Sequence, residues 1–177
     1  MVSTTWVCDR QPILNIVGEL VALGPMRREL MPLFQRWLND LATTRALGDI
    51  QPPWTSEAQD AWYEREYTDP TLIPFTIYTQ PDLTPIGTTA LLDLDWRHRT
   101  AEFGIIIGDR SAHGKGYGTE VTRLMLDYAF TTLGLHNVML EVYEPNLAGK
   151  RAYEKPGFRE FARRTGSYVM GGRRYDT

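Results

Sequence analysis

A glycine-rich turn is the feature of this sequence whose residue types point most directly to chemistry. Gly114, Gly116 and Gly118 stand at alternate positions between an apolar segment and a segment with helical periodicity. Glycines remove side chains where a ligand approaches the backbone, and a helix start offers unpaired N–H groups and the positive end of the helix dipole. The turn therefore predicts a phosphate-binding loop, although glycines before a helix can also serve tight packing.

Two common phosphate-binding motifs fail to match this turn. Four residues separate the first glycine of a Walker A loop from Gly-Lys, but Gly108 lies one residue too far from Gly114-Lys115. Gly116 also stands where the Mg²⁺-binding Ser or Thr of such a loop belongs. A dinucleotide-binding fingerprint has a different glycine spacing and follows an early strand. One rival hypothesis remains: an enzyme that binds nucleotide phosphates with this turn in a way that matches neither motif.

The turn is similar instead to the acyl-CoA loop of the GNAT superfamily of N-acetyltransferases. That loop reads Gln or Arg, two residues, Gly, one residue, and then Gly or Ala. In this chain it reads His113-Gly114-Lys115-Gly116-Tyr117-Gly118, followed by Thr119-Glu120. His113 departs from the usual first residue. An aromatic there, followed by Gly-Lys-Gly-Tyr and Thr-Glu, resembles the ribosomal-protein and polyamine (RimJ/RimL-like) branch of the superfamily.

A second segment, Asn146 to Phe158, resembles the family's Asn-x-x-Ser-x-Arg-x-Tyr-Glu-Lys-x-Gly-Phe motif. Gly149 replaces the Ser, which removes one hydrogen-bonding group, and Pro156 replaces an apolar residue and sharpens the helix stop. The resemblance extends from about residue 18 to residue 175. It implies an α/β fold of the mixed α+β kind, in which helices flank a mostly antiparallel sheet with one splayed parallel pair of strands.

The resemblance also implies an activity, the transfer of acetyl from acetyl-CoA, as co-substrate, to a primary amine by direct attack and without a metal. The acceptor could be a protein N-terminus, a polyamine, an aminoglycoside-like antibiotic or an amino acid. In the family the pantetheine arm enters between the two parallel strands, and loop N–H groups hold the pyrophosphate. The residues that this implies for cofactor binding are Ile105, Ile106, Ile107, His113, Gly114, Lys115, Gly116, Tyr117, Gly118, Thr119, Asn146 and Arg151.

Several of these residues have a second interpretation. For the three isoleucines we expect the backbone to bind and the side chains to lie in the core. Lys115 could be solvated instead of bound, and for His113 we favour a packing or phosphate-edge role over acid–base work. Asn146 can cap the helix that follows it and still lie near the cofactor.

Two side chains are predicted to carry the proton transfers. Tyr153 resembles the family's tyrosine that protonates the leaving thiolate, and its alternative role is to pack its helix onto the sheet. Glu102 is the preferred proton acceptor, directly or through a water, because a carboxylate is costly to bury without a purpose. A surface glutamate is the alternative. Asp93 and Asp95 share one face of the preceding strand if side chains alternate, and could attract a cationic acceptor or act as the base.

The periodicity of apolar residues predicts the elements that position these groups. A strand at 19–24 precedes a helix over Leu30 to Leu41 and a second helix from Ser56 to Tyr67, which begins with a Ser56/Gln59 capping box. Strands at 75–79, 86–96 and 101–107 form an antiparallel meander. A helix over 119–133 then crosses to a parallel strand at 137–142. A helix to about Lys155 and an extended segment over 158–170 follow.

Composition is that of one globular domain, which we place at residues 18–177 after an N-terminal extension at 1–17. The net charge of −3 disfavours nucleic-acid binding and suits a cationic acceptor. Cys8 is the only cysteine and is interpreted as incidental. We expect a cytoplasmic enzyme without a membrane partner, since no apolar run is long enough to span a bilayer and Met1 to Ile16 lacks the layout of a signal peptide.

The acceptor side and the last strand are the least specified parts. Trp54, Trp62, Tyr63 and Glu66 are candidate walls of the acceptor pocket, or else core. The chain stops near the start of the relatives' last strand, so that strand is either truncated or unusually short after Gly171-Gly172, and we expect a weakened sheet edge that a homodimer could cover. A GNAT-like module that binds acyl-CoA as a sensor, without catalysis, is the alternative function.

Overall fold

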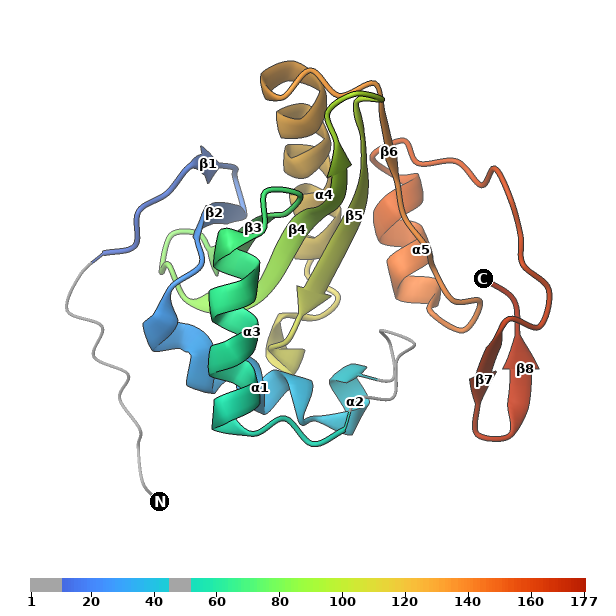
Figure 1. Ribbon diagram of the computed structural model, residues 1–177, viewed down its shortest axis with the longest axis horizontal. Coiled ribbons are helices and arrows are strands. Elements are labelled where there is room, and N and C mark those ends of the chain that lie inside the picture. The colour runs from blue at the N-terminus through green and yellow to red at the C-terminus, as the bar shows by residue number, and fades with distance from the viewer. Residues whose placement is uncertain (1–10, 45–51) are drawn as a thin grey trace.

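A computed structural model describes residues 11–44 and 52–177 of the chain (Figure 1). Cys8 and the predicted turn at Gly48 lie outside these residues. The main sheet has six strands in the order of the chain, β1 to β6. Their bounds are Ile16–Val17, Val21–Pro25, Ile73–Thr79, Pro85–Asp95, Thr100–Ile107 and Asn137–Met139. The α/β fold with a mixed sheet is thereby confirmed, and β1 is a short strand that the sequence did not predict.

The meander and the crossover have the predicted directions. β3, β4 and β5 pair antiparallel, and β6 pairs parallel with β5 after the intervening helix. The predicted strand over 137–142 is wrong in length, because only Asn137–Met139 pair, with Thr100–Glu102. Beyond these three rungs β5 continues to Ile107 while the chain after Met139 leaves the ladder, so the two strands part at the β6 edge of the sheet.

The early helices differ from the prediction at their ends. A 3₁₀ turn, Arg28–Leu30, precedes α1 (Met31–Leu38), and α2 (Leu41–Thr44) is separate from it because Asn39 and Asp40 break the helix. The Asp40 carboxylate accepts the N–H of Ala42, which starts α2 afresh. α3 spans Ser56–Thr68, but its N-cap is Thr55, whose hydroxyl accepts the N–H of Ala58, so the predicted capping box is wrong. Gln59 is instead buried.

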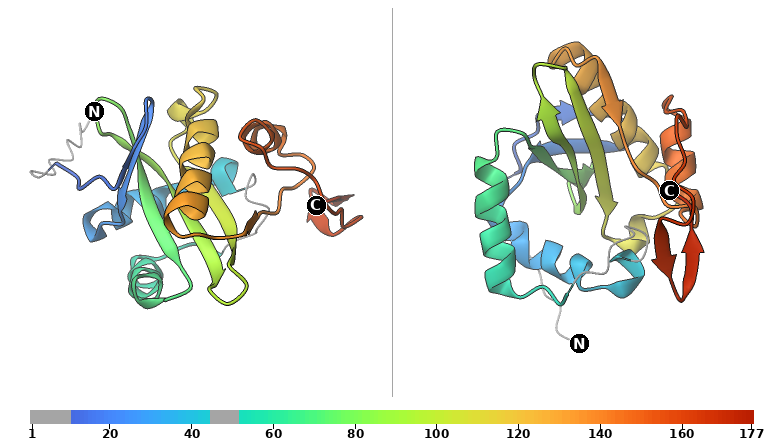
Figure 2. Two further views of the ribbon diagram at one scale, coloured as in Figure 1. Left: turned by 90° about the horizontal axis from the view of Figure 1, so that it is seen from above. Right: turned by 45° about the vertical axis from the view of Figure 1, so that its right-hand side comes forward.

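The later helices carry the glycine turn and the second motif. A 3₁₀ turn, Arg110–Ala112, precedes α4 (Tyr117–Asp127), which continues as a π-helical turn, Tyr128–Thr132, to Gly134. α5 spans Leu147–Glu154. α4 and α3 lie on opposite faces of the sheet (Figure 2). The predicted core face of α4 is confirmed, since Val121, Leu124 and Met125 are buried against the sheet. A smaller apolar cluster, Met26, Met31 and Phe34, joins α1 to α3.

The last part of the chain contributes little to the main sheet. The predicted extended segment over 158–170 is a strand only at β7 (Tyr168–Met170), which forms a hairpin with β8 (Arg173–Tyr175) across Gly171-Gly172. This hairpin is a separate two-stranded sheet that stands away from the larger one, beside α5 (Figures 1 and 2). Among the described residues, no helix has the length and apolar character that crossing a membrane requires.

Gly108, the residue after β5, packs against α1. A Cβ atom on Gly108 would lie 2.1 Å from Cδ2 of the Trp37 indole, so the ring rests directly on this peptide. Trp37 also stacks on Phe34 of the smaller cluster, with ring centroids 5.4 Å apart. Because an indole held in this way has little room to move, the residue before the glycine turn must lack a side chain.

We predict that Gly108→Ala lowers the free energy of unfolding by about 1–3 kcal/mol, since the new methyl overlaps a rigid ring. Chemical denaturation measures this change. Gly104→Ala is the matched control, because its Cβ would meet only the flexible end of Leu92, at 3.0 Å. Equal stability of the two variants would contradict the contact.

Candidate functional site

The open edge of β5 is the centre of the candidate site. Main-chain groups of Phe103 to Ile107 pair with β4 on one side only, because β6 has already ended at Met139. Ile105 and Ile107 pack their side chains against the core, as expected, whereas Ile106 is half-buried and is not part of the core cluster. An extended, amide-bearing ligand can hydrogen-bond to such an edge in the way a strand does.

The glycine turn begins where β5 ends. Gly114 and Gly116 adopt left-handed conformations, with φ of 73° and 88°, which L side chains rarely adopt. Gly116 is the N-cap of α4, so the N–H groups of Tyr117, Gly118 and Thr119 lie at its open start. Gly118 faces α5, where a Cβ would lie 3.7 Å from that of Ala152, an ordinary van der Waals distance. The turn can therefore bind an anion at a helix N-terminus.

His113 holds the turn onto the strand. Its Nε2 lies 2.8 Å from the carbonyl oxygen of Ile107, and the side chain is otherwise exposed. A carbonyl only accepts, so Nε2 carries the proton in this contact. The arrangement matches the packing role favoured for His113. Lys115 is fully on the surface of the same turn, where its charge can reach a phosphate or stay solvated.

Glu120 anchors α4, a role that the sequence did not reveal. Its carboxylate is 8% exposed and accepts the N–H groups of Glu19, Leu20 and Val21 at 2.8, 2.8 and 2.9 Å. Arg123 lies 3.5 Å from it. The first turn of α4 is thereby fixed to the turn between β1 and β2. The only signal in the sequence was an acidic residue at the start of an otherwise apolar helix face.

The second motif forms α5 and its cap. The Asn146 side chain accepts the N–H of Gly149 at 2.8 Å, which confirms the predicted cap. A Cβ on Gly149 would lie 2.7 Å from Nδ2 of Asn146, so a side chain at this position would require the Asn146 side chain to shift. Arg151 lies exposed on α5, two residues after Gly149.

Tyr153 points from α5 toward the sheet. Its ring lies edge-on to Phe103 of β5 and to Phe158, with centroids 6.1 and 6.2 Å apart. Burial raises the pKa of the Tyr153 phenol above its usual value, so the group stays protonated at neutral pH. It thus meets the requirement for a proton donor beside the gap, while it also packs α5 as the alternative role would have it.

Glu102 lies at the last rung before β5 and β6 part, opposite Met139. Its side chain is exposed, which matches the alternative of a surface glutamate and removes burial as an argument for its role as the base. The buried neighbours are Ala101 and Phe103. The strict alternation assumed for Asp93 and Asp95 is also wrong, because β4 is irregular there and Asp93 has a φ of 49°. The Asp95 carboxylate accepts the N–H of His98 and closes the turn to β5.

The proposed acceptor walls cluster at α1 and α3. Trp54 and Trp62 meet edge to face at 6.3 Å, and Trp62 and Tyr63 pack on the smaller apolar cluster. The Arg28 guanidinium lies over the Tyr63 ring, at 4.7 Å. Glu66 pairs with Arg65 at 3.1 Å. Trp62 and Tyr63 are therefore partly core, which is the alternative that the sequence left open.

Comparison with known proteins identifies the family. Residues 21–159 match the family described as "Acetyltransferase (GNAT) domain". The chain belongs to the GNAT acetyltransferase family. It is 36% identical, over 91 residues, to the spermidine N(1)-acetyltransferase of Vibrio cholerae serotype O1, a match that covers 51% of this chain and 52% of that protein. To the Escherichia coli K12 spermidine N(1)-acetyltransferase it is 29% identical over 144 residues, 78% of this chain and 72% of the relative.

A solved structure of a relative has the same fold. The crystal structure of spermidine N-acetyltransferase from Vibrio cholerae in complex with CoA and spermine superposes with a TM-score of 0.81 at 26% identity, over 90% of this chain and 92% of the other. The GNAT resemblance is thus confirmed, whereas no ribosomal-protein acetyltransferase is among these relatives. The match to the first of the curated relatives spans about half of that protein's length. In residues 11–44 and 52–177 no three His, Cys, Asp or Glu side chains are grouped to hold a metal ion.

The two left-handed glycines provide a test of the loop. We predict that Gly114→Ala weakens coenzyme A binding by about tenfold, because an L residue at a φ of 73° costs about 1–2 kcal/mol and shifts the loop. Calorimetric titration measures the dissociation constant. Gly134→Ala is the matched control, with a φ of 66° at the far end of α4 and, like Gly114, open space around its Cβ. Equal loss of affinity in both variants would contradict a specific role for the loop.

Proposed function

We propose that this chain is an N-acetyltransferase that transfers acetyl from acetyl-CoA to a primary amine of a polyamine. The observation that carries the proposal is the open backbone edge of β5, which runs directly into a glycine turn at the start of α4. One end of this arrangement suits amides and the other suits phosphates, as pantetheine and its pyrophosphate require. The named relatives act on spermidine, which supports the polyamine as acceptor over a protein N-terminus.

Different residues bind different parts of acetyl-CoA. Gly114, Gly116, Gly118 and Thr119 donate N–H groups to the pyrophosphate, with Lys115 adding charge and Tyr117 and His113 supporting the turn. The backbone of Ile105, Ile106 and Ile107 holds the pantetheine amides and places one N–H on the thioester oxygen. Asn146, at the start of α5, and Arg151, on α5, also bind the cofactor. These roles rest on the family motifs together with the positions of the residues around the gap.

The chemistry needs three proton transfers. Glu102, directly or through a water, takes the proton from the ammonium form of the acceptor, and the free amine attacks the thioester carbon. As the tetrahedral intermediate collapses, the carbon–sulfur bond breaks and the Tyr153 phenol gives its proton to the leaving thiolate. The proton that the attacking nitrogen loses on becoming an amide then restores the phenol. An exposed carboxylate at the point where β5 and β6 part suits a cationic acceptor, and a phenol kept neutral by burial suits the donor.

We predict that Tyr153→Phe lowers kcat by about 100-fold while changing the KM for acetyl-CoA little, since the phenol acts on the leaving group. Release of coenzyme A with spermidine present measures this. Because its folded-state pKa is raised, Tyr153 itself should not cause a loss of activity until the pH exceeds the ordinary tyrosine value of about 10. Unchanged kcat in the variant would contradict its role as acid.

The activity itself is tested by mass spectrometry of products after incubation with acetyl-CoA and a panel of amines. Acetylated spermidine or spermine is the expected product. Binding of acetyl-CoA with no product from any amine would favour the alternative, a sensor module without catalysis. Thermal stabilisation by ATP but not by acetyl-CoA would favour a nucleotide-phosphate enzyme.

The assembly and location are also proposals. One related structure is described as a dodecameric spermidine N-acetyltransferase from Vibrio cholerae, which supports a homo-oligomer larger than the expected homodimer. Sedimentation analysis measures the mass of the assembly. A cytoplasmic location and the boundary between an extension at 1–17 and a domain at 18–177 stay predictions of the sequence, although Ile16–Val17 already pair with β2.

A further inference from the structure

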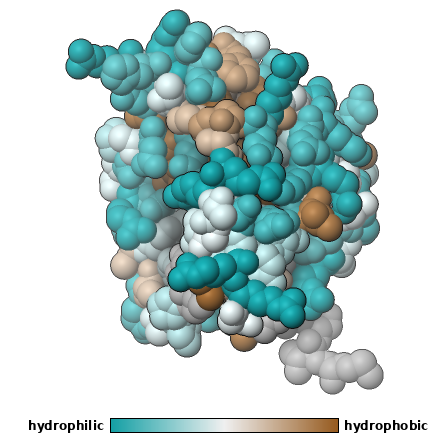
Figure 3. Space-filling view, turned by 90° about the vertical axis from the view of Figure 1, so that its right-hand side faces the viewer, coloured by the Kyte–Doolittle hydropathy of each residue, from teal (hydrophilic) through white to brown (hydrophobic). Residues whose placement is uncertain are grey.

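Thr89 is a polar residue in the interior of the molecule. Hydrophilic residues cover most of the face shown in Figure 3, and threonine is ordinarily found on such a surface. Thr89, in contrast, is only 2% exposed, on β4. It lies opposite Ile105 in the ladder, so its side chain shares a face of the sheet with an isoleucine that packs against the core. A hydroxyl buried among apolar groups is costly unless it has a hydrogen-bond partner.

The partner of this hydroxyl is a main-chain carbonyl of β5. Thr89 Oγ1 donates to the carbonyl oxygen of Gly104 at 2.8 Å. Gly108 donates its N–H to the carbonyl oxygen of Ile86, which marks a bonded pair at the end of β5. Bonded pairs recur at every second position of this regular register, so Ala90 and Gly104 form another. The Gly104 oxygen therefore accepts two hydrogen bonds, both from β4.

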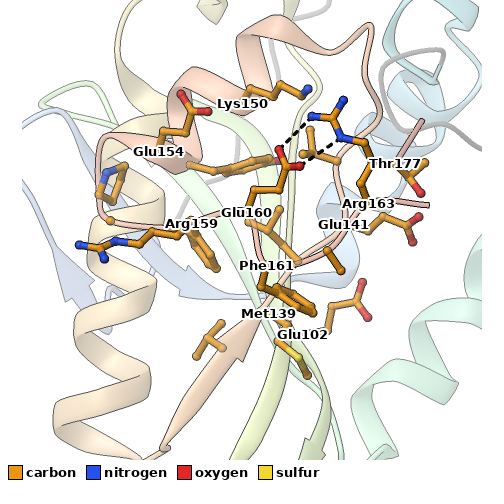
Figure 4. Close-up of a pocket in the computed structure, with 18 of the residues that line it drawn as sticks. Glu102, Met139, Glu141, Lys150, Glu154, Arg159, Glu160, Phe161, Arg163 and Thr177 are labelled. Atoms are coloured by element: carbon orange, nitrogen blue, oxygen red, sulfur yellow. Dashed lines mark hydrogen bonds and ion pairs between the residues drawn. The ribbon is translucent and has the colours of Figure 1, made fainter. Parts of the chain in front are cut away.

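The N–H of the same peptide group points into the gap. In a planar trans peptide the N–H lies opposite the C=O, so the Ile105 N–H points away from β4 when the Gly104 carbonyl points toward it. On that other side β6 no longer pairs, because the last rung of its ladder joins Glu102 to Met139, which Figure 4 shows near each other. The Ile105 N–H therefore faces the gap that the pantetheine arm is proposed to enter.

This N–H is the one best placed for the thioester oxygen. By the same alternation, Ile105 and Ile107 both present N–H groups to the gap. Ile105 is the nearer of the two to Phe103, whose ring centroid lies 6.1 Å from that of Tyr153. The thioester sulfur must come close to the Tyr153 phenol to receive its proton. The acyl end of the cofactor therefore belongs beside Ile105 and not beside Ile107.

We propose that Thr89 is a positioning residue for acetyl transfer. A hydrogen bond to the carbonyl of a peptide group polarises the group and makes its N–H a stronger donor. The Thr89 hydroxyl in this way strengthens the hydrogen bond from the Ile105 N–H to the thioester oxygen, on which negative charge develops as the amine attacks. The hydroxyl acts through the peptide group and does not itself touch the cofactor. Its role rests on the proposed function, because it belongs to that reaction.

Two substitutions of Thr89 test this role. Thr89→Val removes the hydroxyl and keeps nearly the same shape, and Thr89→Ser keeps the hydroxyl. Since loss of an entire oxyanion donor costs about 100-fold or more, loss of its polarisation alone should lower kcat with spermidine by about fivefold in Thr89→Val. The KM for acetyl-CoA should stay within about twofold, and Thr89→Ser should restore kcat.

Thr76→Val is the matched control. Thr76 is fully buried on β3, and its hydroxyl lies 3.5 Å from the carbonyl oxygen of Pro25. Because β4 separates β3 from β5, this variant loses a buried hydroxyl without a change at the gap. Its kcat should equal that of the unmodified protein. Chemical denaturation measures the stability that each variant loses.

A measurement without turnover separates the role of Thr89 from the proposed function. The infrared carbonyl band of isotopically labelled acetyl-CoA, bound without any amine, should lie at higher frequency in Thr89→Val, because its hydrogen bond is weaker. Thr76→Val should not shift this band. An unshifted band in Thr89→Val, or an equal loss of kcat in Thr89→Ser and Thr89→Val, would overturn the proposal. Binding with a shifted band but no acetylated amine would contradict the proposed function alone.

Discussion

The early end of β6 is the constraint on which the candidate site depends. Three rungs hold β6 to β5, and the chain from Leu140 onward leaves the ladder while β5 continues. A backbone that turns away from its neighbour exposes main-chain groups on both of its sides. On the side of β5 the exposed groups face the gap that leads to the glycine turn.

Much of this arrangement follows from local sequence signals. The alternation of apolar residues located β3, β4 and β5, and the helical periodicity of Val121, Leu124 and Met125 located the core face of α4. Glycines with left-handed φ mark the turn because side chains disfavour that conformation. These signals depend on residues that are close in the sequence, so they can be recognised in a single sequence. The cap of α5 by Asn146 belongs to the same class.

The errors occur where distant contacts decide the structure. Residues 140–142 include the apolar Leu140 and Val142, as a strand would, but the pairing of β6 with β5 ends at Met139. The cap of α3 moved by one residue because burial of Gln59 against Met31 fixes the helix phase. The irregular pairing in β4 likewise removed the assumed alternation of Asp93 and Asp95. The role of Glu120 depends on partners about a hundred residues away, which no local pattern contains.

The contact of Trp37 with Gly108 limits how this chain can change. The indole belongs to α1, beside the cluster that includes the candidate acceptor walls, and the glycine is the peptide that leads into the phosphate-binding turn. A larger residue at 108 fits only if the aromatic at 37 is replaced by a smaller one, so the two positions should vary together during evolution. If α1 were exchanged for the corresponding helix of another acetyltransferase, the residue at 108 would have to be exchanged with it, although positions 37 and 108 are far apart in the sequence.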